Sequence, residues 1–587
     1  MQQSIDRTPA VRLLLSARRK FVSATSTLVR ALWHCLLLYL VLVYRNQIFF
    51  GYPLLAEGII QAVASESNRR KMLARKKSVE TKTCQFKMEA GRLDKAECIA
   101  TVVGYREDSE IFRKCLESYA ANFDKRHKAV CIGIDGKDAE DLHMREVAED
   151  VFGSGLLKID LDESFGHMAR TKLETEMIHE KHLWSEKGDH TDSWMMNSLI
   201  SKATDILQAH GALFCSSDDP RHLCITQPHQ SKKEIMFTTF IFALALARAN
   251  DVEFIWSSDS DSWVFPDTIA VAVDCIKADD KIAGSCTSLT IHNGHVSTVS
   301  TMVAATYEAD LALTSGLLSS CDSTDCQSGP CATFRCDALK SILLPWYNQI
   351  VLGQRPIVNE DRHLTTRLLL TGAKVTYNPL ATVATDTPTT IPKWSAQQVR
   401  WSRATAIESF CYPRMFMMRH PVLFIYSFRR LLVPIVNFAI VARYLLTGVG
   451  SQFSSLQDIG YRIILCGMYA SFRHGSGLKT FFVHGASQVF LQVPQAAFLF
   501  WATVTMFENS WGTSMRSAGE QAKRSKKQFL GQHFWPLLVT TVWIAMVGSA
   551  FVRYVVTYWG LGDPVWGAVG GLIGGAGVFA GAIAVGM

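Results

Sequence analysis

The sequence predicts an α/β nucleotide-binding domain with a mixed, mostly parallel sheet, inserted between N- and C-terminal transmembrane helices. Three observations support this fold class. Hydrophobic residues make up 48% of the 587 residues and charged residues only 19%, a balance typical of a chain partly dissolved in lipid. The apolar residues concentrate at about residues 28–65 and again from about residue 420 to the end. The middle, from about 95 to 400, has the mixed composition of a water-soluble domain.

N-terminal transmembrane segments are expected within residues 27–66. The first, residues 31–44 with the residues just before it, is barely long enough to cross about 30 Å of hydrocarbon. The second, residues 47–65, carries one acid and would return through the bilayer. A single crossing followed by an amphipathic segment is the alternative. Basic residues in 1–26 and in the linker 67–94 flank the pair, which predicts that both flanks lie in the cytosol. A cleavable signal is not expected, because the first apolar run begins too late.

The soluble domain, residues 95–402, shows the pattern of a parallel sheet. Residues 98–105, 128–135 and 252–259 are short, β-rich apolar runs that end in polar residues, as buried parallel strands do. A helical stretch, residues 111–122, lies between the first two. Ligands in such folds gather at the carboxyl ends of the strands. Three candidate binding residues fall there: Tyr105, Asp135 and Asp259.

The polar stretch 160–230 is expected to be a mostly helical insertion with a loop. Residues 403–430 mix aromatics, Met, Arg and two prolines, which favours amphipathic helices lying at the membrane interface. Residues 431–587 are expected to form the C-terminal transmembrane region, ending in a glycine-rich segment that permits close helix packing.

Charge and cysteine usage argue against two other classes of protein. The net charge of +7 comes with basic clusters that lie beside apolar segments rather than among stacking aromatics, which disfavours nucleic-acid binding. The fifteen cysteines include no CxxC pair and no Cys/His zinc spacing. Cys321, Cys326, Cys331 and Cys336 recur every five residues, which is not a usual zinc pattern. A reduced, cytosol-facing domain is expected.

Asp259 and Asp261 form a DxD motif at the end of a predicted strand. Two carboxylates one residue apart can hold a hard divalent cation and its bound diphosphate. The same Asp-Ser-Asp sequence is also a good turn or helix cap, so the motif is weak when taken alone.

Two further motifs carry chemistry. Asp361 is the candidate general base that takes a proton from an acceptor hydroxyl, with Glu360 in support. Both lie where a helix is predicted to start, capped by Asn359. In residues 397–401, Arg400 offers a planar fork for phosphate and Trp401 a face on which a sugar ring can stack. An Arg-Trp pair is also common at membrane interfaces.

Taken together, these motifs resemble the processive family 2 glycosyltransferases, which include cellulose, chitin and hyaluronan synthases. The order is the DxD motif, Ser328-Gly329-Pro330, residues 360–367, residues 397–401 and then membrane helices. The hyaluronan synthase branch, with its fungal relatives, is the most similar over about residues 95–515. The segments that carry this similarity are 104–119, 232–240, 326–330, 345–354, 385–390 and 511–514.

The resemblance implies a GT-A-like fold and a role for each matching residue. The donor would be a UDP-sugar, the metal Mg²⁺ or Mn²⁺, and the acceptor a growing polysaccharide. The donor-binding residues would be Tyr105, Glu107 and Asp135 at the uridine end, Lys232 and Arg400 near the diphosphate, and Asp259. The metal would lie on Asp259 and Asp261, the base would be Asp361, and the acceptor would meet Trp401, Cys326 and Gln397. A small buried core residue is the alternative role for Cys326. The protein would be a multi-pass protein of the plasma membrane with its catalytic domain in the cytosol.

At three places the chain departs from the hyaluronan synthase pattern. Ser285-Cys286-Thr287 stands where that branch has Gly-Gly-Asp, and Ser231 and Lys233 replace a Gly and an Arg. Asn359-Glu360 precedes Asp361 where Gly-Asp is usual. These differences leave the donor sugar and the polymer open, so a chitin-like polymer is an alternative product. A non-processive glycolipid or oligosaccharide transferase is another alternative. A transporter that only binds nucleotide would not need two acidic motifs.

Overall fold

The computed structural model describes residues 54–585 apart from eleven short gaps. These gaps are 91–96, 123–126, 172–187, 215–221, 309–311, 413–414, 416–420, 451–455, 475–476, 507 and 509–525. The predicted first crossing, residues 31–44, and the segment 511–514 therefore lie outside the described residues.

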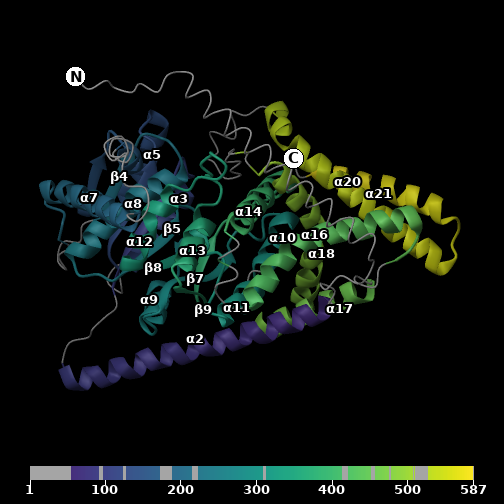
Figure 1. The fold of residues 1–587 in the computed structure, drawn as a ribbon, viewed down its shortest axis with the longest axis horizontal. Coiled ribbons are helices and arrows are strands. Elements are labelled where there is room, and N and C mark those ends of the chain that lie inside the picture. The colour runs from purple at the N-terminus through teal and green to yellow at the C-terminus, as the bar shows by residue number, and fades with distance from the viewer. Residues whose placement is uncertain are drawn as a thin grey trace.

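A nine-stranded mixed sheet forms the centre of the soluble domain (Figure 1). Its order is β3-β4-β2-β1-β5-β8-β7-β9-β6. Most neighbours are parallel, and β8 and β6 supply the antiparallel pairings. The strands are β1 (Cys98–Gly104), β2 (His127–Asp135), β3 (Leu156–Asp160), β4 (His222–Gln227), β5 (Phe254–Asp259), β6 (Trp263–Val264), β7 (Ile282–Ile291), β8 (Ala332–Arg335) and β9 (Lys374–Thr385). The predicted mixed, mostly parallel sheet is confirmed.

Helices cover both faces of the sheet. Successive side chains of a strand point to opposite sides, so each face has its own apolar core. Ile99 and Val103 of β1 join one apolar core, and Ala100 and Val102 join the other. The first core is closed by α7 (Gly188–Ala209), α8 (Lys232–Ala249), α12 (Cys336–Tyr347) and α13 (Glu360–Leu370). The second is closed by α3 (Ser109–Ala121), α5 (Leu142–Phe152) and α9 (Thr268–Lys277). Burial on both faces explains why β1, β2 and β5 read as continuous apolar runs.

A long helix, α2 (Leu54–Ala90), runs along one side of this domain and passes α11 (Ala312–Ser320), as Figure 1 shows. It continues without a break through residue 66, where the sequence predicted the change from membrane segment to linker. Its buried residues, including Asn68 and Met72, face the catalytic domain. Part of the predicted linker is therefore a helix docked on the sheet domain.

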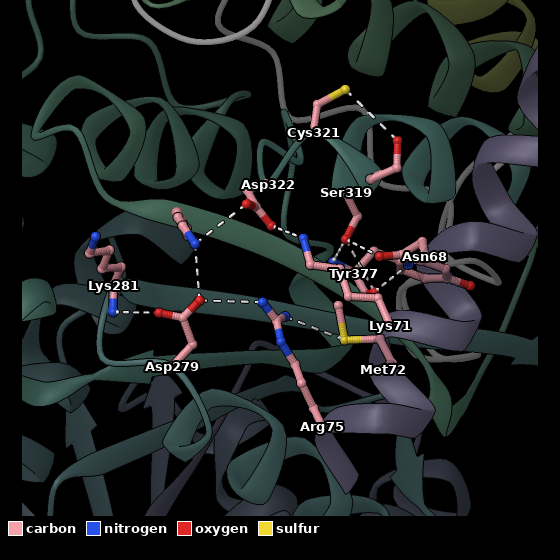
Figure 2. Close-up of polar contacts among 12 residues, drawn as sticks. Asn68, Lys71, Met72, Arg75, Asp279, Lys281, Ser319, Cys321, Asp322 and Tyr377 are labelled. Carbon is pink, nitrogen blue, oxygen red and sulfur yellow. Dashed lines mark hydrogen bonds and ion pairs between the residues drawn. The ribbon is translucent and has the colours of Figure 1, made fainter. Parts of the chain in front are cut away.

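The polar contacts of α2 are drawn in Figure 2. The Asn68 amide donates to the Tyr377 carbonyl over 2.9 Å and accepts a hydrogen bond from the Ser319 hydroxyl over 2.8 Å. Lys71 pairs with Asp322, and Arg75 lies 3.3 Å from Asp279. Two residues of the basic cluster that was expected to mark a membrane flank thus bind acidic residues of the catalytic domain.

The C-terminal region is helical. Its helices are α14 (Ile391–Cys411), α16 (Pro421–Thr447), α17 (Leu456–His474), α18 (Leu478–Val504), α20 (Lys526–Trp559) and α21 (Pro564–Val585). Within the described residues, three stretches are long and apolar enough to cross a membrane: Arg430–Thr447, His533–Trp559 and Pro564–Ala584. C-terminal transmembrane helices are therefore confirmed by length and composition.

Helix α14 connects the two regions, because it packs on α13 of the catalytic domain and on α18 of the C-terminal region. Residues 403–409, which open the predicted interfacial segment, are all buried in this position. Three smaller elements complete the catalytic domain: α10 (Thr298–Thr306) and the 3-10 turns Ala139–Asp141 and Gly153–Gly155. A further 3-10 turn, η4 (Gly329–Cys331), lies in the site described next.

Candidate active site

The predicted acidic motifs meet at one edge of the sheet. Asp259 is the last residue of β5, and Lys232 is the first residue of α8. The Lys232 ammonium lies 2.7 Å from an Asp259 carboxylate oxygen and 3.5 Å from one of Glu360. The Arg400 guanidinium lies 4.0 Å from the same Glu360 oxygen. The structure therefore brings four of the predicted site residues, Lys232, Asp259, Glu360 and Arg400, into one charged cluster.

The start of α8 explains one of the departures from the family pattern. Ser231 is the N-cap residue of this helix, and its hydroxyl accepts a hydrogen bond from the Glu234 amide over 3.3 Å. The same amide donates to the Ser231 carbonyl over 3.0 Å, so the serine hydroxyl adds a second, side-chain acceptor at the helix start. The substitution therefore keeps Lys232 in place at the first turn.

Gly329 lies between Asp259 and Asp361. A Cβ atom built on it would lie 2.7 Å from an Asp361 carboxylate oxygen and 2.8 Å from one of Asp259. Real Cβ atoms essentially never approach oxygens so closely, so a larger residue would displace one of the carboxylates. The glycine of the Ser-Gly-Pro motif thus allows the DxD motif and the predicted base to face the same space.

Burial and mutual repulsion raise the pKa of three carboxyl groups here. The pKa of Asp361 rises to about 7 through burial, although Lys232 opposes this, with Glu360 and Asp259 adding to it. The pKa of Asp261 rises to about 7 through burial and the charge of Asp259. That of Glu107 rises to about 8 through burial and the charge of Asp261. With Asp259 and Glu360, these make five carboxyl groups around two cations, Lys232 and Arg400.

This surplus of carboxyl groups fits a divalent cation. Among the described residues, no group of three or more His, Cys, Asp and Glu side chains is arranged to hold a metal alone. Mg²⁺, however, commonly binds one or two carboxylates and completes its shell with water and substrate phosphates. Asp259 and Asp261 can supply two such carboxylates. The residues present therefore fit a cation that arrives with a diphosphate. Elsewhere, the four regularly spaced cysteines do not form a metal cluster: Cys321, Cys326, Cys331 and Cys336.

The predicted nucleoside end lies at the ends of β1 and β2. Asp135 is buried and accepts hydrogen bonds from the Gln227 side chain and the Gln230 amide, both over 3.2 Å. His229 lies 2.8 Å from the other Asp135 oxygen and stacks on Tyr105, with ring centroids 4.0 Å apart. His229 was not among the predicted residues, because a histidine in a polar loop gives no sequence signal.

Glu107 lies closer to the DxD motif than to this end. One of its carboxylate oxygens accepts a hydrogen bond from the Ser260 hydroxyl over 3.1 Å, and the other accepts from the Asp108 amide over 3.1 Å. Its pKa responds to Asp261. The structure therefore brings Glu107 to the DxD turn, whereas the sequence resemblance grouped it with the uridine contacts.

The predicted acceptor residues lie on the side of the site that faces the C-terminal helices. The Trp401 ring packs edge-on against Tyr307, with centroids 5.8 Å apart. Tyr307 also lies close enough to Arg400 and Asp261 for both charges to affect its pKa, which burial raises. Gln397 is 9% exposed, and its side-chain oxygen has no hydrogen-bond partner among the described residues. Tyr307 is a second residue that the sequence did not single out.

Cys326 is partly buried, and burial raises the pKa of its thiol to about 12, so the thiol stays protonated. Its neighbour Asp325 is held by Arg362 at 2.6 Å and by Arg430 at 2.7 Å. Arg362 follows the predicted base, and Arg430 starts the first candidate membrane span. The Cys326 loop is therefore tied both to the base helix and to α16.

Comparisons with known proteins agree with this geometry. A family model described as "Glycosyltransferase like family 2" matches residues 220–404. Hyaluronan synthase 2 of Mus musculus is 28% identical over 373 residues, which is 63% of this chain and 59% of that protein. Hyaluronan synthase 3 of Homo sapiens is 25% identical over 463 residues, or 78% of this chain and 75% of that protein. The chain thus spans about three fifths of the mouse relative.

Among solved structures, a mannosyltransferase from Pyrobaculum calidifontis in complex with GDP-Man and Mn²⁺ is similar at 12% identity and a TM-score of 0.36. The match covers 73% of this chain and 99% of that one, and it is too distant to assign any residue. The family model, by contrast, covers the charged cluster itself. Residues 220–404 therefore match a glycosyltransferase domain of family 2, and the chain is similar to hyaluronan synthases.

Proposed function

We propose that this protein is a membrane-embedded, processive, inverting glycosyltransferase. It would polymerise sugars from UDP-sugar donors into a polysaccharide and export the product. The observation that carries the proposal is the placement of Asp259 and Asp361 on either side of Gly329. One carboxylate follows the donor-side strand and the other starts the helix expected to carry the base. A donor diphosphate and an acceptor hydroxyl could therefore meet between them.

The charge of each residue in the cluster determines its proposed role in transfer. Lys232 and Arg400 are cations aimed at the site, and they would bind the donor diphosphate and stabilise the departing UDP. Mg²⁺ or Mn²⁺, held by Asp259 and Asp261, would supply Lewis-acid stabilisation of the same leaving group. Asp361 would accept the proton of the acceptor hydroxyl as that oxygen attacks the anomeric carbon. Attack from the opposite side of the ring from UDP inverts the anomeric centre.

The acceptor would enter and leave through the side occupied by Trp401. This ring lies where α10, α14 and α18 meet, and α18 packs on α16 and α20, which contain two of the stretches long enough to cross a membrane. A polar polymer cannot cross lipid unaided, so a path through the same chain would couple synthesis to export. The hyaluronan synthase relatives support a polysaccharide product, whereas the departures at Ser285 and Lys233 leave its sugars open.

The test is to incubate the purified protein in lipid nanodiscs with single UDP-sugars and with pairs of them. Release of UDP with formation of a long polymer supports the proposal, and enzymatic digestion would identify the product. Short products that never lengthen would instead indicate a non-processive glycolipid or oligosaccharide transferase. Excess chelator should stop the reaction and added Mg²⁺ or Mn²⁺ should restore it. Full activity in chelator would rule out the metal on Asp259 and Asp261.

A further inference from the structure

A buried carboxylate, Glu408, contacts Asn359 and His363, which lie on either side of Glu360 and Asp361 in the sequence. It belongs to α14, is 1% exposed, and was not among the residues that the motifs single out. One of its oxygens accepts hydrogen bonds from the Gln349 amide over 3.1 Å, from His363 Nδ1 over 3.0 Å and from the Asn359 amide. A carboxylate with three donors on one oxygen is the centre of a small buried network.

The protonation state of this network follows from its geometry. The Arg367 Nε–H donates to His363 Nε2 over 3.1 Å, so Nε2 carries no proton. His363 is therefore neutral, with its proton on Nδ1 and donated to Glu408, and burial accordingly lowers its pKa to about 4. Burial alone would raise the pKa of Glu408, but the contacts with His363 and Gln349 outweigh it and lower that pKa. Glu408 is thus an ionised carboxylate that accepts the hydrogen bonds of its three donors.

The donors belong to the segment that holds the predicted base. Asn359 directly precedes Glu360 and Asp361, and His363 follows them in the first turn of α13. Asn359 occupies the N-cap position, yet its side chain makes no capping hydrogen bond, because its amide group points to Gln349 and Glu408. The expected helix start at Asn359 is confirmed, but the side-chain capping bond is not formed. The Asn359 side chain instead holds the start of α13 through its hydrogen bonds to Gln349 and Glu408.

Glu408 also belongs to the helix that carries Arg400, two turns earlier. Arg400 reaches the same Glu360 that lies 3.5 Å from Lys232. The carboxylate therefore joins the start of α13, which presents Asp361, to the helix that presents Arg400. Small displacements between these two helices would change the distance between the base and the leaving-group cation.

We propose that Glu408 is a positioning residue for glycosyl transfer, which sets Asp361 against Arg400 by binding Asn359, His363 and Gln349. The inference rests on the proposed function. It predicts that weakening the network lowers the rate of transfer through misplacement of Asp361, while the donor site formed by Lys232 and Asp259 stays intact.

The first test replaces the carboxylate by its neutral, similarly shaped amide. Glu408→Gln should lower kcat by roughly tenfold or more, since misplacement of about 1 Å can cost that much, and should leave the donor KM within about threefold. The matched control is Glu234→Gln. Glu234 is 3% exposed and bound by Tyr347 at 2.6 Å and by Ser164, so the control loses a comparable buried carboxylate. Its kcat should stay near that of the wild type.

A double-mutant cycle separates positioning from general damage. In an Asp361→Asn background the base is gone, so Glu408→Gln should cause no further loss of the residual transfer rate. A further loss of about tenfold in that background would mean that Glu408 does not act through Asp361. Wild-type kcat in the single variant would also overturn the inference.

If Glu408→Gln does not fold, Gln349→Met serves as the milder variant, because it removes one donor to Glu408 and one acceptor for Asn359 and keeps a similar volume. A severalfold lower kcat that disappears in the Asp361→Asn background supports the inference, and an unchanged kcat overturns it. The two proposals fail differently. Wild-type protein that releases no UDP from any UDP-sugar contradicts the proposed function, whereas active wild type with active Glu408 and Gln349 variants contradicts only the positioning role.

Discussion

Individual carboxyl groups decide how the site responds to pH. Asp361 stands in the first turn of α13, where the helix dipole favours its ionised form. Burial and the neighbouring charges of Glu360 and Asp259 favour the protonated form. Their effect is larger than that of the dipole, since the pKa of Asp361 rises to about 7. A base with this pKa is ionised in a large fraction of molecules near neutral pH and still binds a proton well, which suits general-base catalysis.

The rate of transfer should therefore depend on pH in a defined direction. A carboxyl group with a raised pKa is protonated, and inactive as a base, below that pKa. We expect kcat/KM to fall by at least about tenfold per pH unit below about pH 7 and to level off above it. Initial rates of UDP release between pH 5 and pH 9 would measure this, with the pH range chosen around the raised value.

The control for the pH profile is Asp361→Asn, which should be slower by roughly 10²-fold or more at every pH while still binding UDP. A profile that is flat through pH 7 in the wild type, or near-normal turnover in the variant, would remove Asp361 from the role of base.

The glycine of the Ser-Gly-Pro motif supports a second residue-level prediction. Gly329→Ala should reduce activity by roughly tenfold or more, because its Cβ would push Asp361 or Asp259 out of position. Gly460→Ala is the matched control, since a Cβ there meets nothing within 4 Å. Activity assays and thermal unfolding of both variants would check this. Equal activity in the two variants would show that the carboxylates tolerate displacement.

Among the secondary-structure elements, those with a strong local pattern could be predicted. Strands β1, β2 and β5 and helix α3 lie within a few residues of the predicted runs, because strands buried on both faces are apolar throughout. Strand β4 was missed and assigned to a polar insertion. It carries His222, Thr226 and Gln227, and it joins the sheet through pairing with β2 and β3, a tertiary contact that no local pattern reveals.

The same limit applies to the site. Asp259, Asp361 and Arg400 could be predicted because each belongs to a motif with a chemical purpose. Glu408 and His229 act through partners that are distant in sequence, at Asn359 and Tyr105 respectively. Their roles follow from the packing of helices and loops, and a single sequence contains no record of that packing.

Helix α2 offers a test at the level of an element. Its ion pairs to Asp322 and Asp279 are partly exposed and should each contribute at most about 1 kcal/mol. Asn68 is fully buried, and both of its hydrogen bonds cross to the catalytic domain. Asn68→Ala should therefore lower the free energy of unfolding by about 1–3 kcal/mol, because it removes two buried hydrogen bonds and leaves the Ser319 hydroxyl to donate to the Tyr377 carbonyl over 3.4 Å.

Thermal unfolding and limited proteolysis of α2 would measure this loss, with Ser67→Ala on the exposed face of the same helix as the control. If Asn68→Ala and Ser67→Ala unfold alike and resist protease alike, α2 is held by its apolar contacts and not by this buried amide.

In the whole molecule, the catalytic domain meets the C-terminal helices at an aromatic cluster. Trp394, Val399, Tyr307 and Phe498 are buried there, and Trp401 packs against them while remaining partly exposed. The cluster brings together α14, α10 and α18, whose residues are far apart in sequence. Under the proposed function, a sugar that leaves the charged cluster for the membrane helices would pass this junction. Trp401 would then bind the growing chain as well as hold the two regions together.

These two roles of Trp401 predict different kinetics. If its ring orients the acceptor, Trp401→Ala should stop elongation while the donor still binds and is slowly hydrolysed by water, because orientation contributes several kcal/mol to a step between two substrates. UDP release would then outlast polymer formation. Trp401→Phe keeps a stacking face and should retain part of the elongation rate. Trp394→Phe alters a buried member of the same cluster and serves as the control for packing. An equal loss of UDP release and polymer in Trp401→Ala, matched by a similar loss in Trp394→Phe, would mean that Trp401 only packs the junction.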